Sequence, residues 1–502
     1  MNRNLILAFG LSALVLIAFQ TFFAPKTQPA PQKSENTAET AKSQEPSVKL
    51  TVDNTPKVKE KVETFAVQTP MAKFVFNQNT GNVRSAEVLS YEGKPLKDIV
   101  FDSKTDDSLF ITVPVVNSYK PQKTEDGENI TVKFTGSQGD LVVEKTYVIS
   151  KKSYLVTGKI TVSNIGNKTL EVPVRMGLTG GIISALREDK YTFGGPLMYD
   201  GKKTRTEKAE KLDETVTYDK PMWVGYTSKY YLAAIATPFA KGEFIPRDKT
   251  ADIYGDTSVQ VNPASRQVID FNMFVGPKEY DLLKDYGLKL EKSIDFGIFA
   301  FIAIPMLLFL KIIYGFVQNY GIAIILLTVV VKVLTLPLTH KSMVSMKKMG
   351  SLAPKMTELK EKYGADKEKL NQAMMELYKK EGVNPLGGCL PMVLQIPIFF
   401  ALYKTLLLAI ELQGAPFFGW IVDLSVKDPY YITPIIMGAT MFIQQKMTPS
   451  SVQDPIQQKV FMLMPFIFTF MFLTFPAGLV VYWLTNNVLS IAQQYYINKK
   501  TA

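Results

Sequence analysis

The sequence contains a single cysteine, Cys389, and a single histidine, His340, among its 502 residues. With one cysteine, no disulfide can form within the chain. With one histidine, catalysis by paired histidines and metal sites built from several histidines are excluded. These absences argue against most enzyme classes, and we expect no enzymatic activity, no cofactor and no bound metal.

Dense runs of basic residues are also missing, although the formal net charge is +11. The lysines and arginines are spread among acidic residues and gather beside apolar segments, which is the pattern that orients membrane proteins. A protein that binds nucleic acid would concentrate them in a patch or stripe. We therefore expect the lipid bilayer as a partner, and no DNA.

The amino-terminal segment 1–24 has Arg3 followed by an apolar run from Leu5 to Phe23. This run is longer than the ~7–15-residue core of a signal peptide, and no small-x-small cleavage site precedes Ala24. We predict an uncleaved transmembrane anchor with its amino end in the cytoplasm. A cleaved signal peptide is the alternative.

Segment 25–57 is rich in proline, serine, threonine and mixed charge, so it is predicted to be a flexible linker. In segment 58–290 apolar and polar residues alternate with a period of two, in stretches such as KFVFNQNTG, NITVKFTG, LVVEKTYVIS and YLVTGKITVSNIGN. Turn signals separate them at Thr80-Gly81, Asp126-Gly127, Gly166-Asn167 and Gly194-Gly195-Pro196. Many short strands at this spacing predict a large all-β sandwich, which lies outside the cytoplasm if the anchor is oriented as above.

From Ser293 onward the chain is strongly apolar, and we count candidate membrane spans of about 20 residues. Five of them lie at 319–340, 385–410, 430–447, 460–475 and 478–496. With the anchor they give six predicted spans, of which the last five form an α-helical transmembrane bundle over 319–498. The predicted fold is therefore a multi-domain membrane protein with a periplasmic β-sandwich.

Segment 293–318 contains one more apolar stretch, FGIFAFIAIPMLLFLKIIYGFV. Lysines crowd segment 341–381, whereas the loop 411–429 holds three acidic residues and one lysine. This asymmetry puts 341–381 in the cytoplasm and 411–429 outside, and a further span would invert both. We predict that 293–318 is an amphipathic helix in the outer interface of the membrane.

Apolar residues within 341–381 recur at spacings of three and four. They are Met349, Leu352, Met356, Leu359 and Tyr363 and, after a break at 363–366, Leu370, Met374 and Leu377. The pattern predicts two short helices with facing apolar seams. We expect this cytoplasmic helical hairpin to contact a partner; a simple connector is the alternative.

Lys332 stands in the apolar run TVVVKVLTLPL, where a charge costs roughly 2.5–3.5 kcal/mol on the mildest insertion scales. Thr328, Thr335 and Thr339 lie three or four residues away and share its helix face. Snorkelling toward the cytoplasmic end, ~12 Å away, is one interpretation. The threonines on the same helix face favour the other interpretation, in which Lys332 lies in a polar and hydrated site.

Further polar groups lie in the other predicted spans. Gln395 is surrounded by MVLQIPIFF, and Asn486 and Ser490 follow Tyr482 and Trp483 in the last span. Individually, such amides most often link helices. Because no acidic residue within the spans can neutralise Lys332, the set predicts a polar site that receives an acidic group.

Three long stretches are VNPLGGCLPMVLQIPIFFALY, DPYYITPIIMGATMFIQQKM and DPIQQKVFMLMPFIFTFMFLTFPAGLVVYW. With the order of anchor, sandwich and spans, they resemble the YidC–Oxa–Alb family of membrane protein insertases in its Gram-negative form. The resemblance implies five conserved spans around a hydrophilic groove that opens to the cytoplasm and the lipid. Lys332 matches the groove's positive residue, which is arginine in most bacterial relatives. The matching groove or substrate positions are Thr328, Gln395, Phe399, Tyr482 and Trp483.

The resemblance also implies an insertase and chaperone of the bacterial inner membrane, with both chain ends cytoplasmic. It would act on nascent membrane proteins, alone or with the Sec translocon. The ribosome or the signal-recognition machinery would bind at the hairpin, and only weakly through the short tail YYINKKTA. Two other classes stay open: a transporter or channel with an intramembrane cationic site, and a periplasmic carbohydrate-binding or enzymatic domain on an anchor.

Overall fold

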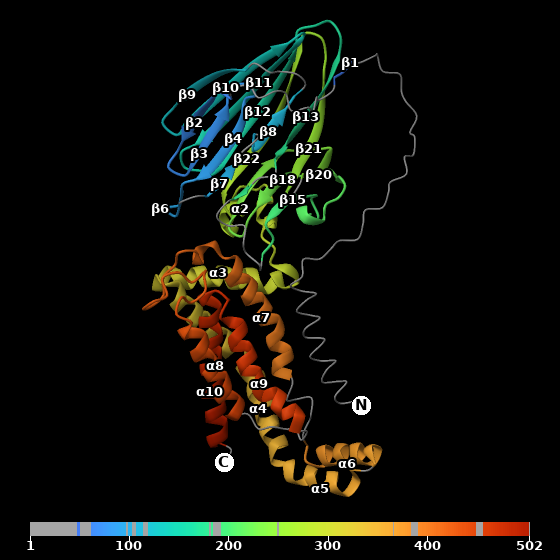
Figure 1. Ribbon diagram of the computed structural model, residues 1–502, viewed down its shortest axis with the longest axis vertical. Coiled ribbons are helices and arrows are strands. Elements are labelled where there is room, and N and C mark those ends of the chain that lie inside the picture. Colours follow the sequence, from blue (N-terminus) through green and yellow to red (C-terminus); the bar gives the residue numbers. More distant parts are fainter. Residues whose placement is uncertain are drawn as a thin grey trace. The chain divides into compact units, whose positions relative to one another are not determined.

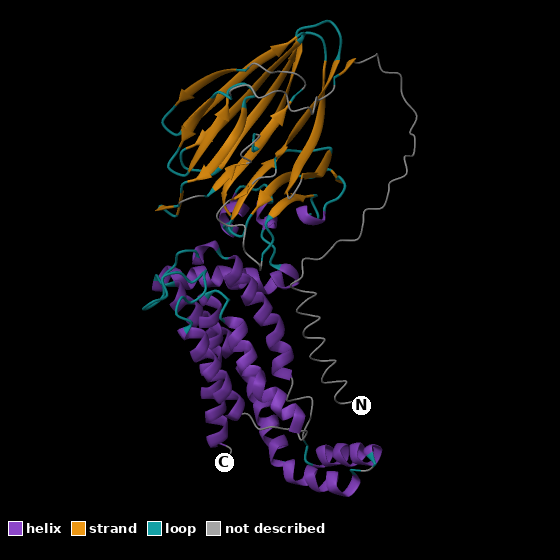
Figure 2. Cartoon of the chain, in the orientation of Figure 1, coloured by secondary structure: helices purple, strands orange, loops and turns teal. Residues whose placement is uncertain are grey.

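The computed structural model describes residues 48–50, 62–96, 99–102, 107–113, 119–179, 182–183, 192–247, 250–364, 366–382, 390–447 and 455–500. The predicted anchor 1–24 and most of the linker 25–57 lie outside these residues. The chain divides into two compact units, 1–294 and 295–502. Strands fill the first unit and helices the second (Figure 1 and Figure 2).

The first unit contains two large sheets. One holds β1 (Val48–Lys49), β2 (Thr64–Gln68), β3 (Ala72–Asn77), β4 (Asn82–Val88), β7 (Val100–Asp102), β8 (Leu109–Thr112), β13 (Leu170–Leu178), β14 (Ile182–Ile183), β17 (Val216–Asp219), β20 (Lys241–Arg247) and β21 (Thr250–Val261). The other holds β9 (Lys120–Glu125), β10 (Asn129–Gln138), β11 (Leu141–Ser150), β12 (Leu155–Asn164), β15 (Gly195–Tyr199), β16 (Thr204–Thr206), β18 (Trp223–Thr227), β19 (Tyr231–Ala236) and β22 (Ser265–Pro277). Smaller elements are the pair β5 (Ser90–Tyr91) and β6 (Lys94–Pro95), η1 (Ala209–Lys211), α2 (Tyr280–Asp285) and η2 (Leu290–Ser293).

The strand order is β14-β7-β4-β8-β13-β21-β20-β17 in the first sheet and β16-β15-β18-β19-β22-β12-β11-β10-β9 in the second. The predicted alternating stretches form β3, β10, β11 and β12, and their side chains alternate between buried and less buried positions. Phe76 of the first sheet contacts Phe134 and Tyr147 of the second, with ring centroids 5.6 and 5.2 Å apart. The predicted β-sandwich is confirmed, with the core between the two sheets.

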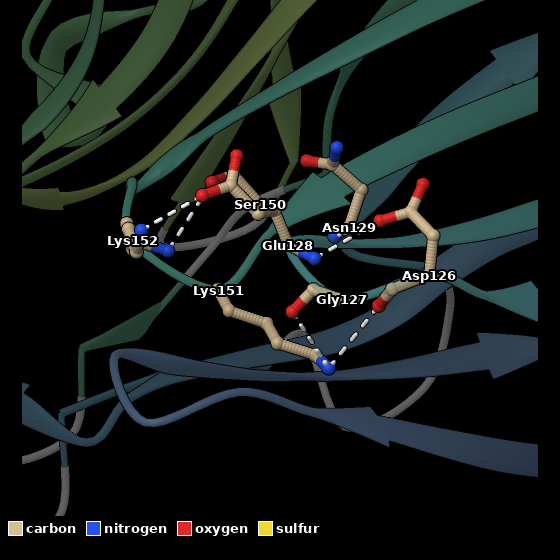
Figure 3. Close-up of polar contacts among 7 residues, drawn as sticks. All are labelled: Asp126, Gly127, Glu128, Asn129, Ser150, Lys151 and Lys152. Atoms are coloured by element: carbon tan, nitrogen blue, oxygen red, sulfur yellow. Dashed lines mark hydrogen bonds and ion pairs between the residues drawn. The ribbon is translucent and has the colours of Figure 1, made fainter.

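The predicted Asp126-Gly127 turn joins β9 to β10 (Figure 3). The Asp126 carboxylate accepts hydrogen bonds from the backbone N–H groups of Glu128 and Asn129, at 3.0 and 2.7 Å. Lys151 donates to the carbonyls of Asp126 and Gly127, at 3.4 and 3.5 Å. Such Asx bonding explains why Asp-Gly marks a turn in sequence.

Two features of this unit differ from the sequence prediction. The predicted turn Gly194-Gly195-Pro196 is wrong at its second half, because Gly195 and Pro196 begin β15; proline is tolerated at the start of a strand. Inside the predicted linker, Val48 and Lys49 form β1, which pairs in parallel with Leu170 and Glu171 of β13.

Lys145 of β11 lies in the core and is 2% exposed. Its ammonium donates to the carbonyl of Thr80 at 2.7 Å, to the side-chain oxygen of Asn82 at 2.9 Å and to the carbonyl of Ile111. All three acceptors belong to the other sheet or its β3–β4 turn, so this side chain joins the two sheets. Burial lowers the pKa of Lys145 to about 7, and the charge of Asp107 acts in the opposite direction.

We expect this buried lysine to make the sandwich more stable as the pH rises from about 7 to about 10. The unfolded lysine keeps its proton up to a pKa near 10.5, so unfolding takes up a proton within this window. The free energy of unfolding should therefore gain about 1 kcal/mol per pH unit relative to Lys145→Met. Fluorescence of Trp223 in a Trp420→Phe, Trp483→Phe background isolates the first unit, and Lys159→Met, on an exposed side chain, is the control. Parallel pH profiles for the parent and Lys145→Met would contradict the expectation.

The second unit is helical. Its elements are η3 (Gly297–Phe299), α3 (Ala300–Val317), α4 (Tyr320–Ser351), α5 (Ala353–Tyr363), α6 (Lys367–Lys380), α7 (Leu390–Leu408), η5 (Ile410–Leu412), α8 (Ile432–Met447), α9 (Pro455–Phe472) and α10 (Ala477–Lys500). Helix α10 packs against α4, α7 and α8, and α8 packs against α9. Helices α4, α7, α8, α9 and α10 overlap the five predicted spans of 319–498.

Helix α4 is longer than the predicted span 319–340. It runs on to Ser351, so the helix pair begins at α5 rather than at residue 341. At its start, Gln318 has a positive φ of 52° and the side chain of Asn319 accepts the N–H of Ile322. The cap satisfies an N–H that the first helical turn leaves unpaired, so α4 begins here as a helix separate from α3.

Helix α3, within the predicted segment 293–318, differs from the amphipathic pattern. The side chains that it packs against its neighbours are apolar, and so are the exposed Phe301, Ile312 and Phe316. Its one charged residue, Lys311, is paired with an acid within the unit. A helix that is apolar all round needs a surrounding of lipid or protein.

Helices α5 and α6 lie side by side, as the apolar spacing predicts (Figure 1). Met349, Leu352, Met356 and Tyr378 form a buried cluster against which Met374 and Leu377 pack. Asp366 caps α6 by accepting the N–H groups of Glu368 and Lys369. The helical hairpin is thus present, and its side of the membrane stays a prediction.

Among the described residues, two helical segments are long and apolar enough to cross a membrane, Gly297–Val317 and Tyr320–Ser351. The segments Gln395–Leu408 and Met462–Phe472 are shorter apolar helices. The count of six spans therefore stays a prediction.

Candidate functional site

Lys332 lies on the face of α4 that packs against α10. Its ammonium donates a hydrogen bond to the hydroxyl oxygen of Ser490 at 2.7 Å. Ser490 is 3% exposed, and its own hydroxyl donates to the backbone carbonyl of Asn486 at 2.7 Å. Within the part of the chain that the structure describes, Lys332 has no acidic partner.

The Lys332 side chain leans toward the carboxyl-terminal end of α4. A Cβ placed on Gly478 of α10 would stand 3.4 Å from Cδ1 of Ile324 of α4. These two residues therefore lie at about the same height along the two helices. Lys332 follows Ile324 by eight residues and Ser490 follows Gly478 by twelve. Ser490 is therefore about 6 Å, or roughly one turn, beyond the level of Lys332. This direction of the Lys332 side chain agrees with snorkelling, but its ammonium binds a buried hydroxyl inside the bundle.

A second polar contact joins the same two helices further along. The Gln493 side-chain amide donates to the hydroxyl of Thr339 at 3.1 Å, and Thr339 is buried. We call Lys332, Thr339, Ser490 and Gln493 the α4–α10 polar seam. Sequence reasoning missed Gln493, whose spacing of three residues from Ser490 on a helix was the available signal.

Thr328 and Thr335 share the Lys332 face as predicted, but their hydroxyls are used locally. Thr328 donates to the carbonyl of Ile324 at 2.6 Å, and Thr335 donates to that of Val331 at 3.0 Å. Such bonds to the preceding turn are common for threonine in apolar helices. The hydroxyls of these two residues are therefore used within α4, and the residues contribute small side chains to this face rather than hydrogen-bond donors.

Gln395 and Tyr482, predicted from different spans, contact each other. The amide of Gln395 on α7 donates to the phenolic oxygen of Tyr482 on α10 at 3.0 Å, and Tyr482 is 2% exposed. Asn487 similarly joins α10 to α8 through Thr440 at 3.2 Å. Both contacts fit the expectation that intramembrane amides link helices.

The predicted Phe399 and Trp483 also meet, in an aromatic cluster. Their ring centroids are 4.9 Å apart and the rings are nearly perpendicular. Phe468 and Phe472 of α9 lie against the same indole, at 5.9 and 5.0 Å. Trp483 therefore connects α7, α9 and α10 through aromatic contacts.

The loop between α7 and α8 packs on the amino-terminal ends of α4 and α10. The N–H of Gly478 donates to the carbonyl of Leu424 at 2.9 Å. The side chain of Asn319 donates to the carbonyl of Phe417 at 3.3 Å. These bonds hold the loop over the ends of two helices that carry the polar seam.

An ion pair ties α3 to this end of the unit. Lys311 lies 3.5 Å from Glu411, whose side chain is 2% exposed. About two turns away along α3, the Thr405 hydroxyl of α7 donates to the Ala303 carbonyl at 3.0 Å. Both contacts fix α3 across the end of α7.

Two sequence models of known families match the chain. The one described as YidC periplasmic domain covers residues 64–309, and the one described as 60Kd inner membrane protein covers residues 312–502. The membrane protein insertase YidC of Syntrophus aciditrophicus is 39% identical over the whole of both chains. That of Geotalea daltonii is 39% identical over 99% of each.

The chain belongs to the YidC family. The resemblance inferred from the motifs is thereby confirmed. A crystal structure of an active YidC insertase with its first transmembrane domain resolved is 20% identical, with a TM-score of 0.39 over 98% of this chain and 99% of that one. The family models assign a periplasmic domain to most of the first unit and an inner membrane protein to most of the second.

In this YidC-family chain six of the eight predicted site residues fall into three groups, and Thr328 and Thr335 bond within α4. Lys332 reaches Asn486 through Ser490, Gln395 meets Tyr482, and Phe399 meets Trp483. The arrangement offers one cation with a neutral partner and an aromatic surface. Among the described residues, no cluster of side chains suits a metal ion.

Proposed function

We propose that this chain inserts membrane proteins into the bacterial inner membrane and helps them fold, without covalent chemistry. Full-length relatives are named membrane protein insertase. The observation that carries the proposal is the Lys332 ammonium, which, among the residues that the structure describes, is held between apolar helices by a hydroxyl and not by an acid. A transporter or channel has no specific observation in its favour.

The proposed mechanism is electrostatic. A carboxylate that enters the bilayer alone pays a prohibitive desolvation cost. A cation about 4 Å away in a partly hydrated site recovers several kcal/mol of that cost. The neutral hydroxyl and amide groups around Lys332 bind the tail weakly enough for it to leave again.

The proposed substrate site comprises Lys332 and the residues that flank it along a hydrophilic groove. The flanking residues are Thr328, Thr335, Gln395, Phe399, Tyr482, Trp483 and Asn486. The aromatic cluster around Trp483 gives the apolar part of a nascent helix a surface to contact before it enters lipid.

Reconstitution tests the proposal directly. Purified full-length protein in liposomes should insert a small single-span protein, detected as a protease-protected tail, and should not release an encapsulated solute. Solute flux without insertion would favour the transporter class.

We also propose the six-span topology with both ends cytoplasmic, the sandwich over 58–290 periplasmic and 293–318 in the outer interface. In a Cys389→Ser background, single cysteines at Ser351 and Val422 should label from opposite sides of the membrane. Ser351 and Val422 are both exposed, whereas Ser425 of the same loop is buried and would label poorly. Labelling of both sites from one side would disprove this topology.

The hairpin within 341–381 is proposed to dock the targeting machinery, the ribosome or the Sec translocon. Replacing the tip 360–369 by a short Gly-Ser turn spares the cluster around Met356 and Tyr378. We expect several-fold lower insertion of ribosome-delivered substrates in cells and near-normal insertion in liposomes, because docking is lost while the bundle stays folded. Equal insertion by the variant and the parent in cells would make the hairpin a connector.

A further inference from the structure

Ser490 accepts the hydrogen bond that the Lys332 ammonium donates across the α4–α10 contact, at 2.7 Å. Its hydroxyl hydrogen is directed to the Asn486 carbonyl, so its oxygen faces Lys332 only as an acceptor. Ser490 is buried, and the bond to the preceding turn of α10 fixes its rotamer. The ammonium is therefore held by a rigid neutral group.

A neutral acceptor holds a cation without cancelling its charge. An ammonium has three N–H donors, and among the described residues one of the three is used, on Ser490. Two donors remain for an incoming carboxylate, which forms a stronger bond than a hydroxyl does. An acid at position 490 would fill the same place permanently.

We propose that Ser490 is a positioning residue that sets the specificity of this site for acidic substrate tails. It keeps the Lys332 ammonium at one place on the α4–α10 polar seam and leaves its charge available. The proposal rests on the proposed function, because it assigns a role within the same site. Gln493, one turn further along α10, carries a buried side-chain oxygen without a hydrogen-bond partner among the described residues. That oxygen is a second neutral acceptor toward which an unrestrained ammonium can move.

The test uses full-length protein in liposomes and two substrates, one with aspartates in its translocated tail and a twin with asparagines. Ser490→Asp should lower insertion of the acidic substrate about tenfold, as Lys332→Ala does, and leave the neutral twin within about twofold. Ser490→Thr, which keeps the hydroxyl, should match the wild type on both substrates. Ser490→Asn is the neutral control of similar size to aspartate.

A double mutant separates positioning from structural support. Ser490→Ala should lower the ratio of acidic to neutral insertion about threefold in the parent and have no effect on that ratio in a Lys332→Ala background. If Ser490→Asp and Ser490→Asn gave the same ratio, or if Ser490→Ala acted equally in both backgrounds, the positioning role would be wrong. A wild-type protein that inserts neither substrate would instead overturn the proposed function.

Discussion

Replacing Lys332 by alanine is expected to lower insertion of a substrate with an acidic tail at least tenfold and to spare the same substrate with a neutral tail. At an effective dielectric constant of about 20, a unit charge pair 4 Å apart is worth about 4 kcal/mol. Losing even about a third of this energy corresponds to a tenfold effect. Lys332→Glu should be worse for the acidic substrate, since it adds repulsion, and Lys332→Arg should retain activity.

The measurement is the insertion yield of the two matched substrates with each variant in liposomes. Substitution at the exposed Val333, next to Lys332 but on the outward face, provides a control that leaves the ammonium in place. If the alanine and glutamate variants handled both substrates like the wild type, Lys332 would be a snorkelling lysine without a role in attraction.

The helices and strands of this protein follow closely from its sequence pattern. Period two predicted β10, β11 and β12, and spacings of three and four predicted α5 and α6, because each element buries one face. The length of α4 did not follow, since the polar residues after His340 were assigned to the helical hairpin 341–381 although they continue α4 to Ser351. Polarity marks the end of an apolar span and not the end of a helix.

The candidate site was predictable as a set of residues but not as contacts. Lys332 stood out because a charge in an apolar run is costly. Its partner Ser490 lies 158 residues away, and the pairing depends on how α4 and α10 pack. The threonine hydroxyls illustrate the converse, because Thr328 and Thr335 share the predicted face and yet bond to their own helix.

The buried ion pair of Lys311 and Glu411 is expected to show the largest effect on stability. Glu411 is almost fully buried, so removing the lysine takes a counter-charge away from a buried carboxylate. Lys311→Met alone, or Glu411→Met alone, should therefore lower the free energy of unfolding by roughly 3–5 kcal/mol. The double variant should recover most of this loss, because two packed methionines need no compensating charge.

The exposed pair of Lys355 and Glu381 in the hairpin is the matched control. Its side chains are 56% and 33% exposed, and removing either should cost at most about 1 kcal/mol because water screens the charges. Thermal unfolding of the full chain in detergent, followed by the fluorescence of Trp420 and Trp483 after Trp223→Phe, reports on the second unit. A double variant as unstable as the worse single variant would mean that the Lys311–Glu411 charges themselves stabilise the fold. Recovery would instead mean that packing alone suffices for stability at this contact.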